Sequence, residues 1–189
     1  MFNSYISNID KSFIQEICMS KGELIHFNRN EDFSTMGQAS SRIGYILNGA
    51  FKYVCLNTSE NKEYNTGFSF SKEFVADYPA CLYGIPSQIS IRAICNSDVY
   101  VIDSQVLASC YDTDIETQRK ARTNAEQLFL QVYSRFLDIY RKSPEERYID
   151  LLKRNPQILQ IMPLKEIASY LRITPTTMSR IRRKITFSI

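Results

Sequence analysis

Short hydroxyl side chains followed by long cations occupy the segment between residues 174 and 184. The side chains that could contact another molecule there are Thr174, Pro175, Thr176, Thr177, Ser179, Arg180, Arg183 and Lys184. When a helix enters the major groove of DNA, short polar groups near its N-terminus approach the base edges, and long cations reach guanine edges and phosphates. The segment therefore predicts a surface that binds double-stranded DNA.

Two short helices are needed to position these side chains, and apolar residues at helical spacing indicate both. They are Leu164, Ile167, Ala168 and Leu171 for the first helix, and Met178 and Ile181 for the second. We expect Thr174 to cap the second helix and Pro175 to open it, after a three-residue turn. This order predicts a helix-turn-helix. An ordinary helical hairpin would show the same apolar spacing, but it would not require the basic outer face.

The turn between these helices carries Arg172 at the position where such motifs usually have glycine. Arginine there requires either a positive φ or an altered turn, and left-handed backbone at a non-glycine residue costs about 1 kcal/mol. The sequence leaves these two geometries open.

Charge is distributed unevenly along the 189 residues. Residues 1–140 contain 12 Lys and Arg against 16 Asp and Glu, a net of −4, whereas residues 141–189 contain 11 against 4, a net of +7. A short basic segment attached to an acidic one is typical of a nucleic-acid-binding module joined to a partner domain. The alternative, a solvated basic tail, does not account for the apolar periodicity.

Residues 22–103 are predicted to form short strands separated by polar turns. The segments rich in Ile, Val, Tyr and Phe are "ELIHFN", "RIGYILNGAFKYVCLN", "NTGFSFS", "SQISIRAIC" and "VYVID". The Asn48-Gly49 pair predicts a hairpin turn between two apolar strands. Short strands at this regular spacing favour a β-sandwich or jelly roll.

A long amphipathic helix is predicted over residues 112–142, which lack both Gly and Pro. Its apolar stripe has coiled-coil spacing, and it predicts a homodimer contact through Ala125, Leu128, Val132 and Ile139. Alternatively, the stripe packs only on the chain's own β-domain, although a helix of about 45 Å would exceed what a small domain covers. Ser143 and Pro144 then mark a break before a new helix that ends at Asn155.

These elements predict an α+β chain with three parts. We expect an effector-type β-roll over residues 1–110, a dimerisation helix over 111–142 and a helix-turn-helix domain over 143–189.

Other functional classes find little support in the composition. The five cysteines form no CxxC pair, and the single histidine, His26, cannot supply a metal site of several imidazoles, so we expect reduced thiols and no metal or cofactor. No phosphate-binding loop, dinucleotide fingerprint or nucleophile elbow is present, so we expect no enzymatic activity. The chain has no apolar run of 18 residues and no signal-peptide pattern, which favours a cytoplasmic location without membrane association.

Taken in order, these parts resemble the Crp/Fnr family of bacterial transcription regulators. The resemblance is carried by "YILNGAFKYV", by "KEFVADYPACL" and above all by "SPEERYIDLLKRNPQILQIMPLKEIASYLRITPTTMSRIRRKI". It implies a jelly roll of the cyclic-nucleotide-binding type, a long dimerisation helix and a winged-helix-like helix-turn-helix domain, here with a minimal wing. It also implies a palindromic operator bound by a homodimer, base contacts through Pro175, Thr176, Ser179 and Arg180, and RNA polymerase as a partner.

The chain departs from the family in the effector pocket. Ser87 and Gln88 stand where the family has a phosphate-binding Arg and its neighbour, and Arg92 could replace that Arg only by a shift in register. Cys18 alone cannot supply the cysteine cluster of the oxygen-sensing branch. We therefore expect no cyclic AMP binding and a pocket for a neutral or weakly charged molecule, walled by Phe74, Tyr78, Gln88, Ser90, Arg122 and Asn124. The alternative is a constitutive dimeric DNA-binding protein whose β-roll binds no effector.

Overall fold

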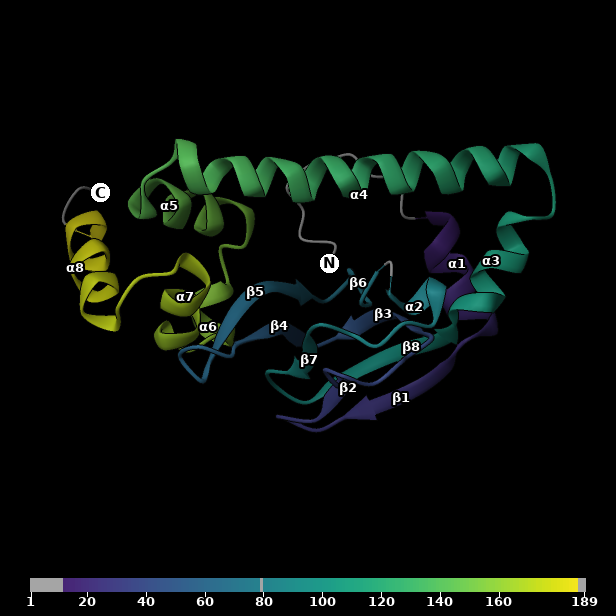
Figure 1. Cartoon of the computed structure of the whole chain (residues 1–189), viewed down its shortest axis with the longest axis horizontal. Helices are drawn as coiled ribbons and strands as arrows, with labels where there is room; N and C mark the ends of the chain where they lie inside the picture. Colours follow the sequence, from purple (N-terminus) through teal and green to yellow (C-terminus); the bar gives the residue numbers. More distant parts are fainter. Residues whose placement is uncertain (1–11, 79, 187–189) are drawn as a thin grey trace.

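Two antiparallel four-stranded sheets and a series of helices make up the computed structural model, which describes residues 12–78 and 80–186 (Figure 1). One sheet has the order β1-β8-β3-β6 and the other β2-β7-β4-β5. The strands are β1 (Glu23–Phe27), β2 (Asp32–Ser34), β3 (Arg42–Asn48), β4 (Ala50–Asn57), β5 (Lys62–Phe70), β6 (Phe74–Val75), β7 (Ser90–Ala93) and β8 (Ser97–Asp103). The predicted α+β class with an N-terminal jelly roll is confirmed.

Eight helices belong to the described residues. They are α1 (Ser12–Lys21), α2 (Ala80–Tyr83), α3 (Ser104–Tyr111), α4 (Ile115–Arg141), α5 (Pro144–Arg154), α6 (Ile158–Ile161), α7 (Leu164–Leu171) and α8 (Pro175–Thr186). Helix α4 runs beside both the sheets and the C-terminal helices, and α8 lies at the outer end of the molecule (Figure 1).

The space between the two sheets is filled by aromatic and β-branched side chains. Phe27, Phe33 and Phe51 are buried, and their ring centroids lie 5.6 to 6.1 Å apart. Tyr53 is also buried, and its hydroxyl lies 2.9 Å from the Ser69 hydroxyl. Burial raises the pKa of Tyr53, so this phenol is neutral at any physiological pH. The interior of the roll is therefore a packed core.

The Asn48-Gly49 pair does not form the predicted hairpin, because β3 and β4 belong to different sheets. Gly49 has a φ of 100°, and a Cβ there would lie 2.1 Å from the Ser97 hydroxyl oxygen. Glycine therefore lets the chain cross from one sheet to the other against β8. The hairpin of this region joins β4 and β5, which pair from Ala50 with Phe70 to Asn57 with Lys62.

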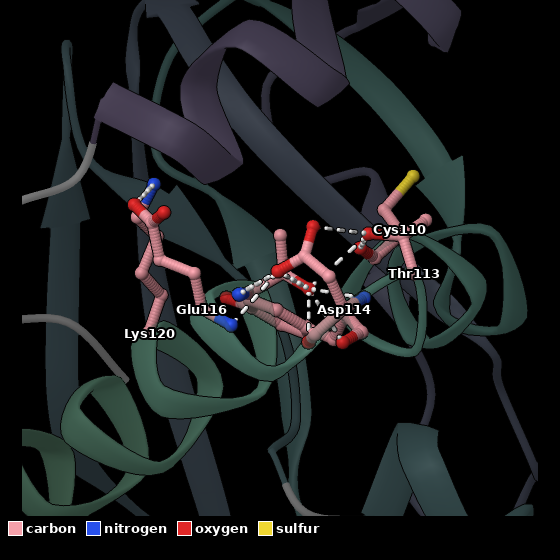
Figure 2. Close-up of polar contacts among 7 residues, drawn as sticks. Cys110, Thr113, Asp114, Glu116 and Lys120 are labelled. Atoms are coloured by element: carbon pink, nitrogen blue, oxygen red, sulfur yellow. Dashed lines mark hydrogen bonds and ion pairs between the residues drawn. The ribbon is translucent and has the colours of Figure 1, made fainter.

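Helix α4 begins three residues later than predicted, because Asp114 caps it. The carboxylate of Asp114 accepts hydrogen bonds of 2.8 Å from the backbone N–H groups of both Glu116 and Thr117 (Figure 2). The bond from Thr117 in particular holds the pKa of Asp114 below its ordinary value. From this cap the helix continues for 27 residues, or about 40 Å at 1.5 Å per residue. Its end at Arg141 agrees with the break predicted at Ser143.

Ser143 and Pro144 begin α5 as predicted. The Ser143 hydroxyl accepts from the Glu146 N–H, and the Glu146 carboxylate accepts from the Ser143 N–H. Where a minimal wing was expected, the chain forms the single helical turn α6, and the described residues 104–186 contain no strand.

Candidate nucleic-acid interface

The helix-turn-helix consists of α7, a turn over residues 172–174, and α8. Thr174 caps α8, because its hydroxyl oxygen lies 3.1 Å from the backbone nitrogen of Thr177 and 2.9 Å from the Thr177 hydroxyl. Pro175 is the first residue of α8. The predicted cap, first residue and turn length are confirmed.

Arg172 adopts the left-handed conformation, with a φ of 57° and a ψ of 44°. Its backbone N–H donates to the carbonyls of Ala168 and Ser169, and the N–H of Ile173 donates to Ala168 at 3.0 Å. These bonds satisfy the last carbonyls of α7, as left-handed helix ends commonly do. Of the two geometries left open by the sequence, the structure contains the positive φ.

One face of α8 is buried in the C-terminal core. Met178 is fully buried, and Ile181 is partly buried beside it. They belong to a cluster that includes Ile167, Ala168 and Leu171 of α7. Because the face with Met178 and Ile181 is buried, the side chains on the opposite face of α8 point outward.

The opposite face of α8 carries most of the side chains that the sequence predicted for DNA. Pro175, Thr176, Ser179, Arg180 and Arg183 are exposed, as is the capping residue Thr174. Thr177 is half-buried, and its hydroxyl takes part in the cap. The arginine ion pairs within residues 12–78 and 80–186 are formed by Arg92, Arg122 and Arg141. Within these ranges, neither Arg180 nor Arg183 pairs with a carboxylate.

Lys184 differs from the other predicted cations because it is held by a carboxylate. Its ammonium lies 2.9 Å from Glu145, in the first turn of α5. Sequence reasoning missed this partner, which is 39 residues away. A phosphate would have to compete with Glu145 for Lys184.

A polar junction fixes α7 against the β-roll. Glu166 accepts from the Lys52 ammonium at 3.1 Å and from the Asn65 side-chain amide at 2.7 Å, while the backbone N–H of Asn65 donates to the Ser169 hydroxyl. Burial alone would raise the pKa of Glu166, but the hydrogen bonds from Asn65 and Lys52 outweigh burial and lower it. The rings of Phe68 and Tyr170 pack 5.0 Å apart at the same place. The helix-turn-helix is therefore docked on β4 and β5.

The stripe predicted for the dimer divides between two surfaces. Leu128 is only 7% exposed, because it packs on the chain's own β-roll, and Ala125 lines a small cavity beneath it. Val132 and Ile139 remain exposed. The contact expected at Leu128 is therefore made within the chain, because the inner side of α4 covers the roll.

An aromatic ridge lies on the exposed side of α4, next to Val132 and Ile139 of the predicted stripe. It consists of Phe129, Tyr133, Phe136 and Tyr140. Their spacing of four, three and four residues is that of a coiled-coil seam. Phe129 is 68% exposed and Tyr140 75% exposed. Phe129 stacks on Tyr133, and Phe136 contacts Tyr140 edge-on, so neighbouring rings cover each other only in part.

Three of the six residues predicted for an effector pocket line the same cavity. Phe74, Tyr78 and Asn124 line a cavity of about 30 Å³ between the roll and α4. That volume holds about one water molecule. The remaining residues do not line it: Gln88 is exposed, Ser90 accepts a hydrogen bond from the Met36 N–H, and Arg122 pairs with Glu126 on the surface of α4.

Arg92, the cation considered for a shifted phosphate site, pairs with two carboxylates of the β-roll. Its Nε donates to Asp32 at 2.8 Å, and a terminal nitrogen lies 3.5 Å from Glu63. The hydrogen bond that Arg92 donates to Asp32 raises the pKa of Arg92 and outweighs the opposing effect of burial. A cyclic phosphate would have to displace these carboxylates.

The described residues contain no cluster of three or more His, Cys, Asp or Glu suited to a metal ion. His26 pairs with Asp98 at 2.7 Å. The five cysteines are free thiols. Burial raises the pKa of Cys18 to about 12 and that of Cys81 to about 11, so both are protonated at neutral pH. No helix of the described ranges has the length and apolar character needed to cross a bilayer.

The fold is shared with several solved transcription regulators. FixK2 from Bradyrhizobium japonicum superposes with a TM-score of 0.75 at 15% identity, over 88% of this chain and 85% of that one. CLP, a c-di-GMP responsive global regulator from Xanthomonas campestris, gives 0.66 at 14% identity, over 95% and 93%. A CRP-family transcriptional regulator from Thermus thermophilus gives 0.64 at 12% identity, over 87% and 85%. The predicted resemblance to Crp/Fnr regulators is thus confirmed for the fold.

The chain matches no protein-family model and no curated protein sequence.

Proposed function

We propose that this chain is a transcription regulator that binds duplex DNA in the cytoplasm, with α8 in the major groove. The observation that carries the proposal is the orientation of α8. Its apolar face is fixed in the core by Met178, while Thr176, Ser179 and Arg180 face outward at the end of the molecule. Recognition helices of helix-turn-helix proteins present their N-terminal residues to base edges in this way.

The exposed cations of α8 divide into two roles in this proposal. Arg180 is close enough to the helix N-terminus to make a bidentate contact to guanine, which is the commonest specific arginine contact in DNA complexes. Arg183, one turn further on, contacts phosphate. Lys184 contacts phosphate only after it leaves Glu145. Sequence specificity therefore depends mainly on Arg180.

The proposal includes a homodimer formed along α4. The aromatic ridge supplies the apolar surface, because its rings are exposed at coiled-coil spacing. Two α8 helices related by a two-fold axis would read half-sites about 34 Å apart, which is one turn of DNA. A palindromic operator follows from that symmetry. RNA polymerase remains a predicted partner of the DNA-bound dimer.

The β-roll acts as a scaffold in this proposal, and two observations favour constitutive DNA binding over control through the roll. The space between the sheets is filled by Phe27, Phe33, Phe51 and Tyr53. The cavity between the roll and α4 has room for about one water. Calorimetry with cyclic AMP should therefore detect no binding. Micromolar binding that is lost in the Arg92→Ala variant would instead support a cyclic-nucleotide site.

Selection of genomic DNA fragments by the full chain tests the proposal. Sequencing of the retained fragments should give one palindromic motif with half-site centres about one helical turn apart. Retention of fragments without a common motif would argue against a regulator. The Arg180→Ala variant in a parallel selection should lose the motif.

A further inference from the structure

Three arginines from three different helices line one cavity at the base of the helix-turn-helix. The cavity has a volume of about 210 Å³ and lies where the C-terminal half of α4 meets α5 and the end of α7. Arg135 comes from α4, Arg147 from α5, and Arg172 from the turn after α7. Figure 1 shows α5 and α7 at the same end of the molecule as the C-terminal half of α4.

The three guanidinium groups are only partly satisfied. Arg135 donates to the carbonyl of Thr66 and lies 5.1 Å from the Tyr170 ring centroid. Arg147 donates to the carbonyl of Leu171 at 3.1 Å, but its Nε is buried without a hydrogen-bond partner. Arg172 lies 5.8 Å from the ring centroid of Tyr64.

Among the described residues that line the cavity there is no Asp or Glu, and none of the three arginines belongs to the ion pairs formed by Arg92, Arg122 and Arg141. Like charges gathered around a partly enclosed space repel each other and lose hydration. An anion in the cavity would relieve both effects, and the planar fork of arginine matches carboxylate and phosphate oxygens.

The backbone at Arg172 is a second, independent observation. Left-handed residues at helix ends are usually Gly or Asn, because a larger side chain is strained there. This chain has an arginine at that position, with a φ of 57°, and the arginine lines the cavity. The turn itself would form more easily with glycine, so its geometry does not explain the arginine.

The rest of the cavity wall is mainly apolar and indicates the kind of anion. It is formed by Val132, Phe136 and Ile139 of α4 and by Tyr170 and Leu171 of α7, with Thr66 of β5. The volume is below the 300 to 1,000 Å³ that is typical for drug-sized ligands. The occupant is therefore small, with an apolar part as well as a charged end.

We propose that this cavity binds a small organic anion, whose carboxylate or phosphate group contacts Arg135, Arg147 and Arg172 and whose apolar part packs on Phe136 and Tyr170. The site is separate from the roll interior and from the exposed face of α8, and it shares Phe136 with the aromatic ridge of α4. Because its three arginines lie on α4, α5 and the end of α7, the ligand would also hold the helix-turn-helix against the long helix.

Calorimetry of the full chain with phenyl phosphate, in low salt and without DNA, tests the site independently of the proposed DNA binding. We expect saturable binding of one phenyl phosphate per chain and weaker binding of inorganic phosphate, which lacks the apolar part. The Arg172→Gly variant should bind phenyl phosphate at least tenfold more weakly, since a charge-assisted hydrogen bond is lost. It should fold normally, because glycine suits the left-handed turn.

Lys72→Gly is the matched control, because Lys72 is also an exposed cation with a positive φ, of 67°, but does not line the cavity. It should bind phenyl phosphate as the parent chain does. Equal weakening in the two variants, or no binding by the parent chain at millimolar phenyl phosphate, would overturn the proposal. If the parent chain binds no phenyl phosphate and the Arg172→Gly variant binds DNA more weakly than the parent, the arginines contact the DNA backbone instead, and the proposal is also overturned.

Discussion

The carboxylate of Glu166 on α7 lies 3.1 Å from the ammonium of Lys52 on β4, and this pair joins the helix-turn-helix to the β-roll. The two side chains are only 19% and 15% exposed. Asn65 donates to the same carboxylate from β5. The position of α8 relative to the roll therefore depends on a largely desolvated polar junction as well as on apolar packing.

Removing the carboxylate should destabilise the chain measurably. Glu166→Ala removes the acceptor of Lys52 and one of the two acceptors of Asn65, whose amide also donates to the Glu166 backbone carbonyl. We expect this loss in a half-buried place to lower the free energy of unfolding by about 1 to 3 kcal/mol. Glu126→Ala is the control, because it removes the partner of Arg122 in an exposed pair and should cost less than about 0.5 kcal/mol. Urea unfolding followed by circular dichroism measures both. Equal losses in the two variants would show that the junction adds no stability.

The same carboxylate should make stability depend on pH. Hydrogen bonds from Asn65 and Lys52 hold the folded pKa of Glu166 below its ordinary value of 4.5, so the unfolded chain takes up a proton first as the pH falls. The stabilisation is fully present above pH 4.5 and is lost as the pH falls through the lower folded pKa. The melting-temperature difference between the parent chain and Glu166→Gln should therefore shrink in that acidic range. A difference that stays constant from pH 7 to pH 3 would contradict the assignment.

Substitutions on the two sides of α4 should have different effects. Phe129→Glu combined with Tyr133→Glu places charges on the exposed aromatic ridge, and it should give a folded monomer that loses only the stability supplied by association. Leu128→Asp places a carboxylate in the core beneath the helix and should cost several kcal/mol of stability. Sedimentation and thermal melting distinguish these outcomes. Gln157→Glu with Gln160→Glu, on the exposed surface near α6, is the charge-matched control and should remain dimeric. A ridge variant that also remains dimeric would refute the proposed interface.

The helix-turn-helix was predictable because its signals are local. Met178 falls at helical spacing from Ile181, Thr174 and Pro175 begin a helix, and the structure contains these features where expected. Local signals were insufficient at Asn48 and Gly49, because they indicate a tight turn but not which sheet the next strand joins.

Contacts between distant segments could not be predicted from the sequence, because local patterns do not show which segments pack together. The periodicity of α4 identified apolar residues, but it could not assign Leu128 to the roll and Phe129 to the outer surface, since the helix has two apolar sides. Arg135 and Arg172 line one cavity because the chain folds α7 back onto β4 and β5, where Glu166 contacts Lys52 and Asn65. No spacing rule along the chain predicts such a meeting.

The role of Arg180 is the central claim, and binding of the Arg180→Ala variant to two duplexes tests it most directly. Fluorescence anisotropy should compare the motif recovered from genomic DNA with a scrambled duplex of the same composition, and Arg183→Ala is the control. A lost guanine contact is worth about 1 to 3 kcal/mol of discrimination, so Arg180→Ala should weaken binding to the motif about 5- to 150-fold more than binding to the scrambled duplex. Arg183→Ala should weaken both duplexes alike, as expected for a phosphate contact. Equal losses on the two duplexes for Arg180→Ala would contradict the account.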